Sequence, residues 1–302
     1  VDLSTSGVAT LGVDYSLLGS ITISAGDEKD SIVFTALDDT IYEGDELAII
    51  NISSVTNAIE NGVQSANVTI TEDESIPSVT LSASSGSVSE VGGTSQIIAS
   101  LSHGSAQDVT VDLSTSGVAT LGVDYSLLSS ITISAGDEKD SIVLTALDDT
   151  IYEGDELAII SISSVTNAIE NGVQIENVII KENEAIPTIS MNITEPTISE
   201  NGGTTNVVFT LSHATTVNVD VTLTTSGLAI YGIDYSLSLN KTISAGDEKD
   251  SLMITGIEDY IFEGNESANL DISSVIGALE DGVQSDNILI QDDESIPHIS
   301  LS

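Results

Sequence analysis

The chain has 302 residues, of which 48 are Asp or Glu, five are Lys and none is Arg, and its formal net charge is −43 at pH 7. This charge excludes nucleic acid as a partner and disfavours an anionic membrane surface, because both interactions need clustered cations on the protein. Hydrophobic residues make up 40% of the chain, which indicates a folded protein rather than an acidic disordered one. Cysteine is absent, so a secreted protein of this composition needs a stabiliser other than disulfides, and bound metal is the obvious one.

Two further signals are missing from the sequence. No uninterrupted apolar run reaches the roughly 18 residues of a membrane span. No basic-then-apolar stretch of the signal-peptide type opens the chain. We therefore expect no membrane insertion in this segment, and we expect a signal peptide and a membrane span to lie outside it.

The sequence repeats itself with a period of 110 residues. The segment VDLSTSGVATLGVDYSLL at 1–18 recurs unchanged at 111–128, and 67 of the first 76 residues are identical 110 positions later. A diverged third copy starts at Val221 with VTLTTSGLAIYGIDYSL. A period of this length matches a whole domain rather than a solenoid repeat of about 20 to 50 residues. Each repeat is therefore expected to fold around its own core.

The dipeptide Ile-Pro marks the joints between copies, at Pro77, Pro187 and Pro297, each time after an acidic cluster and before a new apolar alternation. No Gly/Ser-rich or Pro-rich linker separates the copies, which predicts little slack between neighbours and an elongated array. The predicted domains are a repeat truncated at its N-terminus (1–76, repeat 1), two complete repeats (77–186, repeat 2, and 187–296, repeat 3) and the start of a further repeat (297–302).

Within a repeat, taken in chain order, the apolar residues alternate with period two, as expected for half-buried strands. The clearest segments are Val207, Phe209 and Leu211, then Val217, Val219, Val221 and Leu223, then Ala268, Leu270 and Ile272. About seven such segments recur in each repeat, separated by turn residues. They predict an all-β fold of tandem antiparallel β-sandwiches with Greek key connections. The stretch DDTIYEGDELA is predicted to be a loop entering a strand, because Gly154 and the β-branched residues after it disfavour a helix.

Carboxylates are packed more densely in the loops than solubility requires. In repeat 2 they are Asp124, Asp148, Asp149, Glu153, Asp155, Glu156, Glu182 and Glu184. In a sandwich these loops can meet at one end of the domain, where two charges about 4 Å apart repel by roughly 4 kcal/mol at an effective dielectric near 20. Such a cluster needs a cation. Oxygen ligands without Cys or paired His favour Ca²⁺ over Mg²⁺ and make a zinc site improbable.

These residues carry a resemblance to the Calx-beta domain. It rests on GVDYS, on the hairpin ITISAGDEKDSIVLTALDDTIYEGDE and on an apolar strand that ends in an acidic cluster, and it covers all three repeats. The resemblance implies an immunoglobulin-like sandwich that binds several calcium ions per repeat at one end. Asn183 and Glu258 depart from the family's Asp pattern, and repeat 1 lacks its opening Glu.

The resemblance also implies the ligands, residue by residue, with the backbone carbonyl contributing at each Ile. In repeat 1 they are Asp14, Asp38, Asp39, Ile41, Glu43, Glu46, Glu72, Asp73 and Glu74. In repeat 2 they are Glu90, Asp124, Asp148, Asp149, Ile151, Glu153, Glu156, Glu182, Asn183 and Glu184. In repeat 3 they are Glu200, Asp234, Glu258, Asp259, Ile261, Glu263, Glu266, Asp292, Asp293 and Glu294.

Each motif also has a simpler interpretation. The acidic loops could be solvated charged turns, although the motif recurs three times with its flanking strands. His103 and His213 are expected in surface turns, and Tyr125 and Tyr235 are expected to anchor the core. Nothing in the sequence matches a nucleophile elbow, a phosphate-binding loop or a zinc motif, so we predict that the chain is not an enzyme.

The sequence favours a structural segment of a long bacterial surface protein, an extracellular adhesin stalk or filament shaft that calcium rigidifies at its joints. The expected partners are calcium ions and the neighbouring repeats, with other chains in a fibre, or a receptor bound through a tip domain elsewhere, as further partners. A regulatory calcium-sensing domain pair is one alternative, although near-identical serial copies argue for length rather than sensing. A glycan- or protein-binding module is another, and the aromatic content of 3% argues against a sugar-stacking surface.

Overall fold

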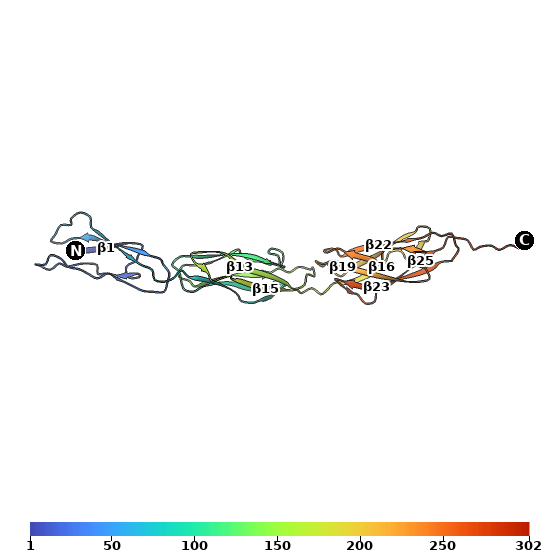
Figure 1. Cartoon of the computed structure of the whole chain (residues 1–302), viewed down its shortest axis with the longest axis horizontal. Coiled ribbons are helices and arrows are strands. Elements are labelled where there is room, and N and C mark those ends of the chain that lie inside the picture. The colour runs from blue at the N-terminus through green and yellow to red at the C-terminus, as the bar shows by residue number, and fades with distance from the viewer. Residues whose placement is uncertain (302) are drawn as a thin grey trace. The chain divides into compact units, whose positions relative to one another are not determined.

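The computed structural model describes residues 1–301, and in this range the regular elements are all strands (Figure 1). No helix within the described range is long and apolar enough to cross a membrane. The predicted all-β fold is therefore confirmed. Each of the three repeats contributes its own sheets.

Repeat 2 is a sandwich of two five-stranded sheets, with strand orders β10-β12-β8-β6-β14 and β11-β9-β13-β15-β7. Its strands are β6 (Ser78–Ala83), β7 (Ser87–Ser89), β8 (Thr94–Leu101), β9 (Val109–Gly117), β10 (Tyr125–Ser126), β11 (Ser130–Ile133), β12 (Lys139–Ala146), β13 (Glu156–Thr166), β14 (Ile169–Glu170) and β15 (Ile175–Lys181). Seven of these strands have four residues or more, which agrees with the predicted number.

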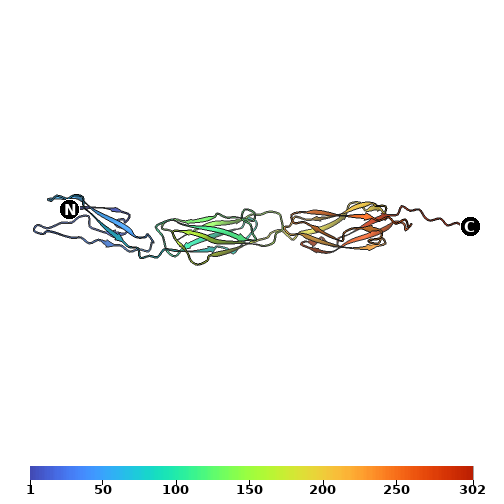
Figure 2. The same cartoon turned by 45° about the horizontal axis from the view of Figure 1, so that its top comes forward.

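Repeat 3 is again a β-sandwich (Figure 2). Its two sheets have the strand orders β20-β22-β18-β16-β24 and β17-β25-β23-β19-β21. Its strands are β16 (Thr188–Ile193), β17 (Thr197–Ser199), β18 (Thr204–Leu211), β19 (Val219–Gly227), β20 (Tyr235–Ser236), β21 (Asn240–Ile243), β22 (Lys249–Gly256), β23 (Glu266–Ile276), β24 (Leu279–Glu280) and β25 (Ser285–Gln291). Most pairs are antiparallel, as predicted, but the short strands β17 and β24 pair in parallel with β25 and β16.

Period-two alternation builds the cores of repeats 2 and 3. In β18 the side chains of Val207, Phe209 and Leu211 are buried, and in β23 those of Ala268 and Leu270 are fully buried. Strand residues that point the other way are exposed or half-buried, as one solvated face requires.

The prediction was wrong for one residue of the second segment. Val217 lies in the loop before β19 and is 51% exposed, because the strand starts only at Val219. Val219, Val221 and Leu223 are buried as expected, and so are Tyr125 and Tyr235, whose rings are fully buried in the cores.

Repeat 1 is less complete. Its strands are β1 (Asp2–Gly7), β2 (Tyr15–Ser16), β3 (Thr35–Ala36), β4 (Glu46–Ser54) and β5 (Ser65–Ile70). They form a three-stranded sheet of order β1-β4-β5 and a separate β2-β3 pair. The core cluster of this repeat contains only Ala9, Tyr15 and Ala48 as fully covered hydrophobic residues in the described range.

The chain forms two compact units, and their division does not follow the repeats. One unit comprises 1–88, 93–146 and 157–180, and the other comprises 89–92, 147–156 and the residues from 181 onward. The second unit thus holds repeat 3 together with two loops and the last segment of repeat 2.

Candidate metal centre

In repeat 1 the acidic loops meet around one small cavity of about 50 Å³. Its walls come from the turn before β2, the loop between β3 and β4, the start of β4 and the segment after β5. All nine residues predicted for this repeat line it: Asp14, Asp38, Asp39, Ile41, Glu43, Glu46, Glu72, Asp73 and Glu74. Residues up to 60 positions apart in the sequence are therefore brought together around one cavity.

The carboxylates of this cavity form two groups. One oxygen each of Asp14, Glu43 and Glu46 lie within 4.8 Å of one another, and the same holds for Asp38, Asp73 and Glu74. Such spacing is too close for several bare negative charges in a half-buried site unless protons or cations compensate them.

Corresponding groups occur in the other repeats. In repeat 3, Glu200, Glu258, Asp293 and Glu294 offer oxygens within 4.8 Å of one another, and in repeat 2, Glu90, Glu182 and Glu184 do so. Asp124, Glu153 and Glu156 hold the positions of the 110-residue repeat that correspond to Asp14, Glu43 and Glu46.

One carboxylate in each repeat fixes the acidic loop through backbone hydrogen bonds. Glu72 Oε2 accepts the N–H groups of Glu43 (2.5 Å) and Gly44 (2.6 Å). Burial by itself would raise the pKa of Glu72, but these two bonds and contacts with Glu74 lower it to about 2. The carboxylate is therefore ionised and pinned in place.

In the other repeats too, a carboxylate accepts two N–H groups of the acidic loop. Glu182 Oε2 accepts the N–H groups of Glu153 (2.6 Å) and Gly154 (2.7 Å), and its pKa is lowered to about 2 against the opposing effect of burial. Asp292 Oδ2 accepts the N–H groups of Glu263 and Gly264 in repeat 3.

Two Asp residues per repeat brace the loops in addition. In repeat 1, Asp39 Oδ1 accepts the N–H of Ile41 at 2.7 Å, and Asp14 Oδ2 accepts the N–H of Thr10 at 2.5 Å. Asp149 and Asp259 accept the N–H groups of Ile151 and Ile261 in the same way. Asp124 and Asp234 each accept a backbone N–H four residues earlier, as Asp14 does. These local bonds are those that Asp side chains make in turns.

The opening Glu of repeats 2 and 3 is buried among other carboxylates. Glu90 is 6% exposed and Glu200 is 8% exposed. Burial, followed by the contacts with Glu182 and with Glu294 respectively, raises the pKa of each to about 8. Glu46, at the start of β4, has its pKa raised to about 7 by burial and then by Asp14.

Among residues 1–301, several buried carboxylate oxygens have no hydrogen-bond partner. They are Glu46 Oε2, Glu184 Oε2, Glu200 Oε1, Glu258 Oε2 and Glu294 Oε2. A buried, unpaired carboxylate oxygen is costly, and a hard cation would satisfy several at once. The donor set consists of carboxylate oxygens, the type of ligand that Ca²⁺ prefers.

The remaining predicted residues of repeat 3 belong to the same electrostatic network. Asp234, Asp259 and Asp292 raise the pKa of Glu263, after burial, and Asp234 and Glu263 do the same for Glu266. In repeat 2, Asp149 contributes to the raised pKa of Glu90, and Asp148 to that of Glu184.

Three predicted ligands of repeats 2 and 3 are not carboxylates, namely Ile151, Asn183 and Ile261. Ile261 is 59% exposed. The Asn183 side chain is exposed and donates from Nδ2 to Glu184 Oε1 at 3.0 Å. The backbone N–H of Ile151 donates to Asp149 Oδ1 at 2.7 Å.

Sequence reasoning missed one cation beside the cluster of repeat 2. Lys181 Nζ forms a 2.5 Å salt bridge with Asp155 and lowers the pKa of that carboxyl group. Thr71 and Gln291 occupy the same position in the other repeats. The rarity of Lys in this chain could have drawn attention to it.

The two His residues considered earlier lie in turns. His103 Nδ1 is 3.2 Å from the carbonyl oxygen of Gly104, and His213 Nε2 is 2.7 Å from that of Ala185. These backbone contacts agree with the expected surface turns.

The model of the Calx-beta domain matches the chain three times in succession, at residues 1–74, 72–184 and 181–294. Among solved structures, CBD12 from CALX1.2 is similar with a TM-score of 0.33 at 13% identity, covering 71% of this chain and 100% of its own. The calcium binding domain CBD12 of CALX1.1 gives a TM-score of 0.30 at 15% identity, covering 61% of this chain and 76% of its own. No curated protein sequence matches significantly.

Proposed function

The chain belongs to the Calx-beta domain family, and from this membership we propose that its repeats bind several calcium ions each through the carboxylate clusters at one end. The observation that carries the proposal is the cavity of repeat 1, which nine predicted residues line together. The buried carboxylate oxygens without partners in all three repeats support it.

Different residues would play different parts in holding the ions. Glu72, Glu182 and Asp292 are pinned by backbone N–H groups and would form the fixed wall of each site. Glu90 and Glu200 would change from a protonated to an ionised state when an ion arrives. Ca²⁺ is a divalent cation that binds 6 to 8 oxygen ligands in flexible geometry.

We further propose that the chain is a structural segment of a long extracellular bacterial surface protein, an adhesin stalk or filament shaft. Near-identical serial repeats favour a segment whose role is to lengthen the protein. Carboxylate sites also suit the millimolar affinities of extracellular calcium modules. Outside cells, calcium would keep such sites filled and the joints between repeats restrained.

Backbone hydrogen bonds across the joints support this stiffening role. The N–H of Tyr42 donates to the Gly104 carbonyl (3.1 Å), and the Tyr42 carbonyl accepts the N–H of Ala106 (2.9 Å). Tyr42 lies between Ile41 and Glu43, both of which line the cavity. An ion that orders this loop would therefore also order its bonds to the next repeat.

The following joint has the same pair of bonds. The N–H of Tyr152 donates to the Ala214 carbonyl (3.0 Å), and the Tyr152 carbonyl accepts the N–H of Thr216 (3.2 Å). Thr215, between these two partners, is 1% exposed.

Distances between spin labels test the stiffening. The chain has no Cys, so labels can be placed at Ser116→Cys and Ser226→Cys, which are exposed in β9 and β19. In millimolar calcium the distribution of distances between the two labels is expected to be narrower than in chelator. A pair within repeat 2, Gln96→Cys with Ser116→Cys, is the control and should change little.

A broad distribution that calcium leaves unchanged would rule out joint stiffening. Calcium binding measured on the same samples by calorimetry then shows whether the binding itself also fails.

A further inference from the structure

Each repeat carries a short uncharged turn whose apolar side chains face solvent. In repeat 2 this apolar turn covers residues 117–123 (GVATLGV), and in repeat 3 it covers residues 227–233 (GLAIYGI). Val118, Leu121 and Val123 are 71%, 47% and 59% exposed. Single exposed apolar residues are normal on a protein surface, but several within one turn form a patch, and such patches mark interaction surfaces.

Hydrogen bonds hold the turn of repeat 2 in one conformation. The N–H of Thr120 donates to Asp124 Oδ2 (2.5 Å), and the Thr120 carbonyl accepts the N–H groups of Val123 (3.1 Å) and Asp124 (3.0 Å). The side chains of Ala119 and Tyr125 are buried and anchor the turn to the core. The exposed side chains are therefore displayed by an ordered loop, which loses little conformational entropy when it binds a partner.

The turn of repeat 3 has the same hydrogen bonds but different exposed residues. The N–H of Ile230 donates to Asp234 Oδ2 (2.5 Å), and the Ile230 carbonyl accepts the N–H groups of Ile233 (3.1 Å) and Asp234 (3.0 Å). All four exposed positions that differ from repeat 2 hold larger or more apolar side chains, namely Leu228, Ile230, Tyr231 and Ile233. Solvation alone would allow polar residues at these positions.

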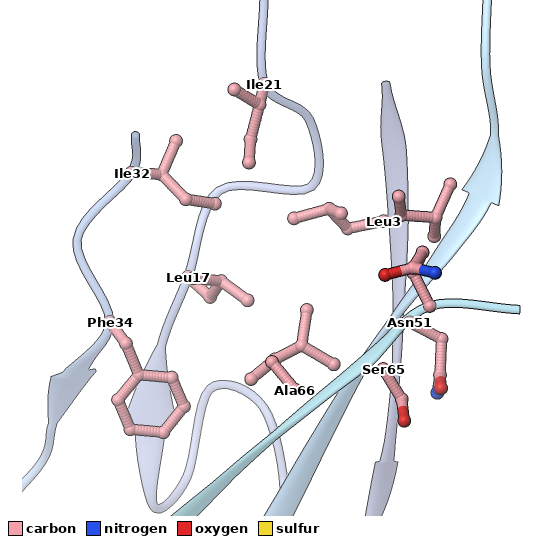
Figure 3. A pocket seen from close by; sticks show the side chains of 11 residues that line it. Leu3, Leu17, Ile21, Ile32, Phe34, Asn51, Ser65 and Ala66 are labelled. Carbon is pink, nitrogen blue, oxygen red and sulfur yellow. The ribbon is translucent and has the colours of Figure 1, made fainter. Parts of the chain in front are cut away.

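The next apolar residue along the chain behaves differently. Leu127 and Leu237 pack against the cores of repeats 2 and 3. Their counterpart in repeat 1, Leu17, lines a pocket together with Phe34 and Ala66 (Figure 3). The cores of repeats 2 and 3 are thus packed without the exposed side chains of the apolar turns, which are available to another molecule.

The exposed area decides what kind of partner fits. Full burial of one aliphatic side chain removes on the order of 100 Å² from water, so one apolar turn offers roughly 200 Å². A specific protein interface buries about 600 Å² or more on each partner. One turn is too small for this. The chain has a third turn of the same sequence at residues 7–13, where Val8 is 73% exposed, and the three turns together reach that area.

We propose that the apolar turns are the surface through which two copies of this chain associate, turn against turn. A second copy carries the same turns at the same 110-residue intervals, so it can engage all of them, whereas an unrelated partner would need matching sites at that interval. The turns are uncharged, but each chain has a net charge of −43, so association requires that salt screens this charge or that bound cations neutralise it.

The inference goes beyond the proposed function and does not require calcium sites. Sedimentation velocity of the full chain at a series of concentrations tests it. In chelator with about 0.5 M sodium chloride, where the Debye length is about 4 Å, the sedimenting mass should rise with concentration towards that of a dimer. Because this buffer contains no free calcium, the result is independent of whether the carboxylate clusters bind calcium.

Substitutions in the turns test whether they form the interface. Val8→Gln, Val118→Gln and Leu228→Gln, made together, place one polar side chain in each turn. These three residues are more than 70% exposed, so the fold should be unaffected. The dissociation constant of the dimer should rise at least about tenfold. Val118→Gln alone should weaken association less than the triple substitution, because two turns remain unchanged.

The matched control is a triple substitution at another repeated position. Val63→Gln, Val173→Gln and Val283→Gln replace residues outside the turns that are 94%, 83% and 91% exposed. This variant should associate as tightly as the parent chain, which separates the turns from exposed apolar residues in general.

Two results would overturn the proposal directly. One is a parent chain that stays monomeric up to about 1 mM in the high-salt buffer. The other is a triple turn variant that associates as tightly as the parent chain. Neutral phosphatidylcholine vesicles test the other apolar occupant. If the chain stays monomeric but sediments with these vesicles, and the triple turn variant does not, the turns bind a lipid surface and pairing is refuted.

Discussion

The carboxylates in the clusters of the repeats are of two kinds. Glu72 and Glu182 accept two loop N–H groups each, and their pKa is lowered to about 2. Glu90 and Glu200 are buried beside other carboxylates, and their pKa is raised to about 8. The first kind stabilises the loop without an ion, whereas the second destabilises it once ionised.

The buried Glu of repeat 3 gives the first prediction. Glu200→Gln removes a group that must ionise in a crowded, buried position, so at pH 8 in chelator the variant should be more stable than the parent chain. In millimolar calcium the order should reverse, because the variant has lost a ligand. Thermal unfolding in both conditions measures the two effects.

The control for this substitution is Glu248→Gln, an exposed residue outside the acidic clusters. It should change the unfolding temperature little in either condition. If calcium raises the unfolding temperature of the Glu200→Gln variant as much as that of the parent chain, Glu200 is not a ligand.

The same shifts predict how stability depends on pH without calcium. A carboxyl group with a pKa raised to about 8 when folded and near 4.5 when unfolded keeps its proton on folding, so its contribution is complete below pH 4.5 and is lost as pH rises through 8. The free energy of unfolding in chelator should therefore fall between pH 5 and 8, by up to about 1.4 kcal/mol per pH unit for each such group.

Glu72 and Glu182 act in the opposite direction, since their contribution is present above pH 4.5 and is lost as pH falls towards 2. Maximal stability without calcium is thus expected near pH 5. Urea unfolding at a series of pH values measures it. Stability that rises steadily from pH 5 to 8 in chelator would contradict the account of Glu90 and Glu200.

At the scale of the elements, β1, β9 and β19 each end in a Gly before the turn that carries Asp14, Asp124 or Asp234. Gly227, at the end of β19, has φ of +125°, and a Cβ there would overlap the Ser267 carbonyl of β23. This close approach of two strands is possible only for Gly.

Gly227→Ala should therefore destabilise repeat 3 by more than about 1 kcal/mol, because strain and overlap add. Gly232→Ala is the matched control, since Gly232 also has positive φ (+82°) but has open space where a Cβ would lie. Urea midpoints compare the two variants. Equal losses would show that the close approach is not what requires Gly227.

Much of this architecture could be predicted from the sequence. Period-two alternation identified the buried positions of β18 and β23, and the segment 148–158 is a loop that enters β13 at Glu156, as expected. The prediction for Val217 was wrong because the alternation of apolar residues continues into the loop before β19. The alternation does not indicate where strand pairing starts. The parallel pairs of β17 and β24 could not be predicted, since two or three residues show no periodicity.

The candidate site could be predicted as a set of residues but not as a set of roles. Loop carboxylates that recur every 110 residues identify the set. Whether a given carboxylate is pinned, like Glu72, or buried without a partner, like one oxygen of Glu200, depends on backbone directions in the folded loop. The joint bonds of Tyr42 and Tyr152 use backbone groups that every residue possesses, so no residue type indicates them.

At the scale of the whole molecule, the joint bonds predict a variant that uncouples binding from stiffening. Thr216→Pro removes the N–H that donates to the Tyr152 carbonyl and changes no proposed ligand. Calcium affinity should be nearly unchanged, whereas the label distances between Ser116→Cys and Ser226→Cys should stay broad in calcium. Thr216→Ser keeps the N–H and should behave like the parent chain. Unaltered narrowing in the Pro variant would show that other contacts restrain the joint.

The most direct test of the central claim is thermal unfolding of the full chain in chelator, in calcium and in an equal concentration of magnesium. A ligand at a hundredfold excess over its Kd stabilises by about 2.7 kcal/mol per site. Calcium should therefore raise the unfolding temperature of repeats 2 and 3 by about 10 °C or more, with a much smaller rise in magnesium. An unfolding temperature that is the same in calcium as in chelator would contradict the account and leave the acidic loops as solvated turns.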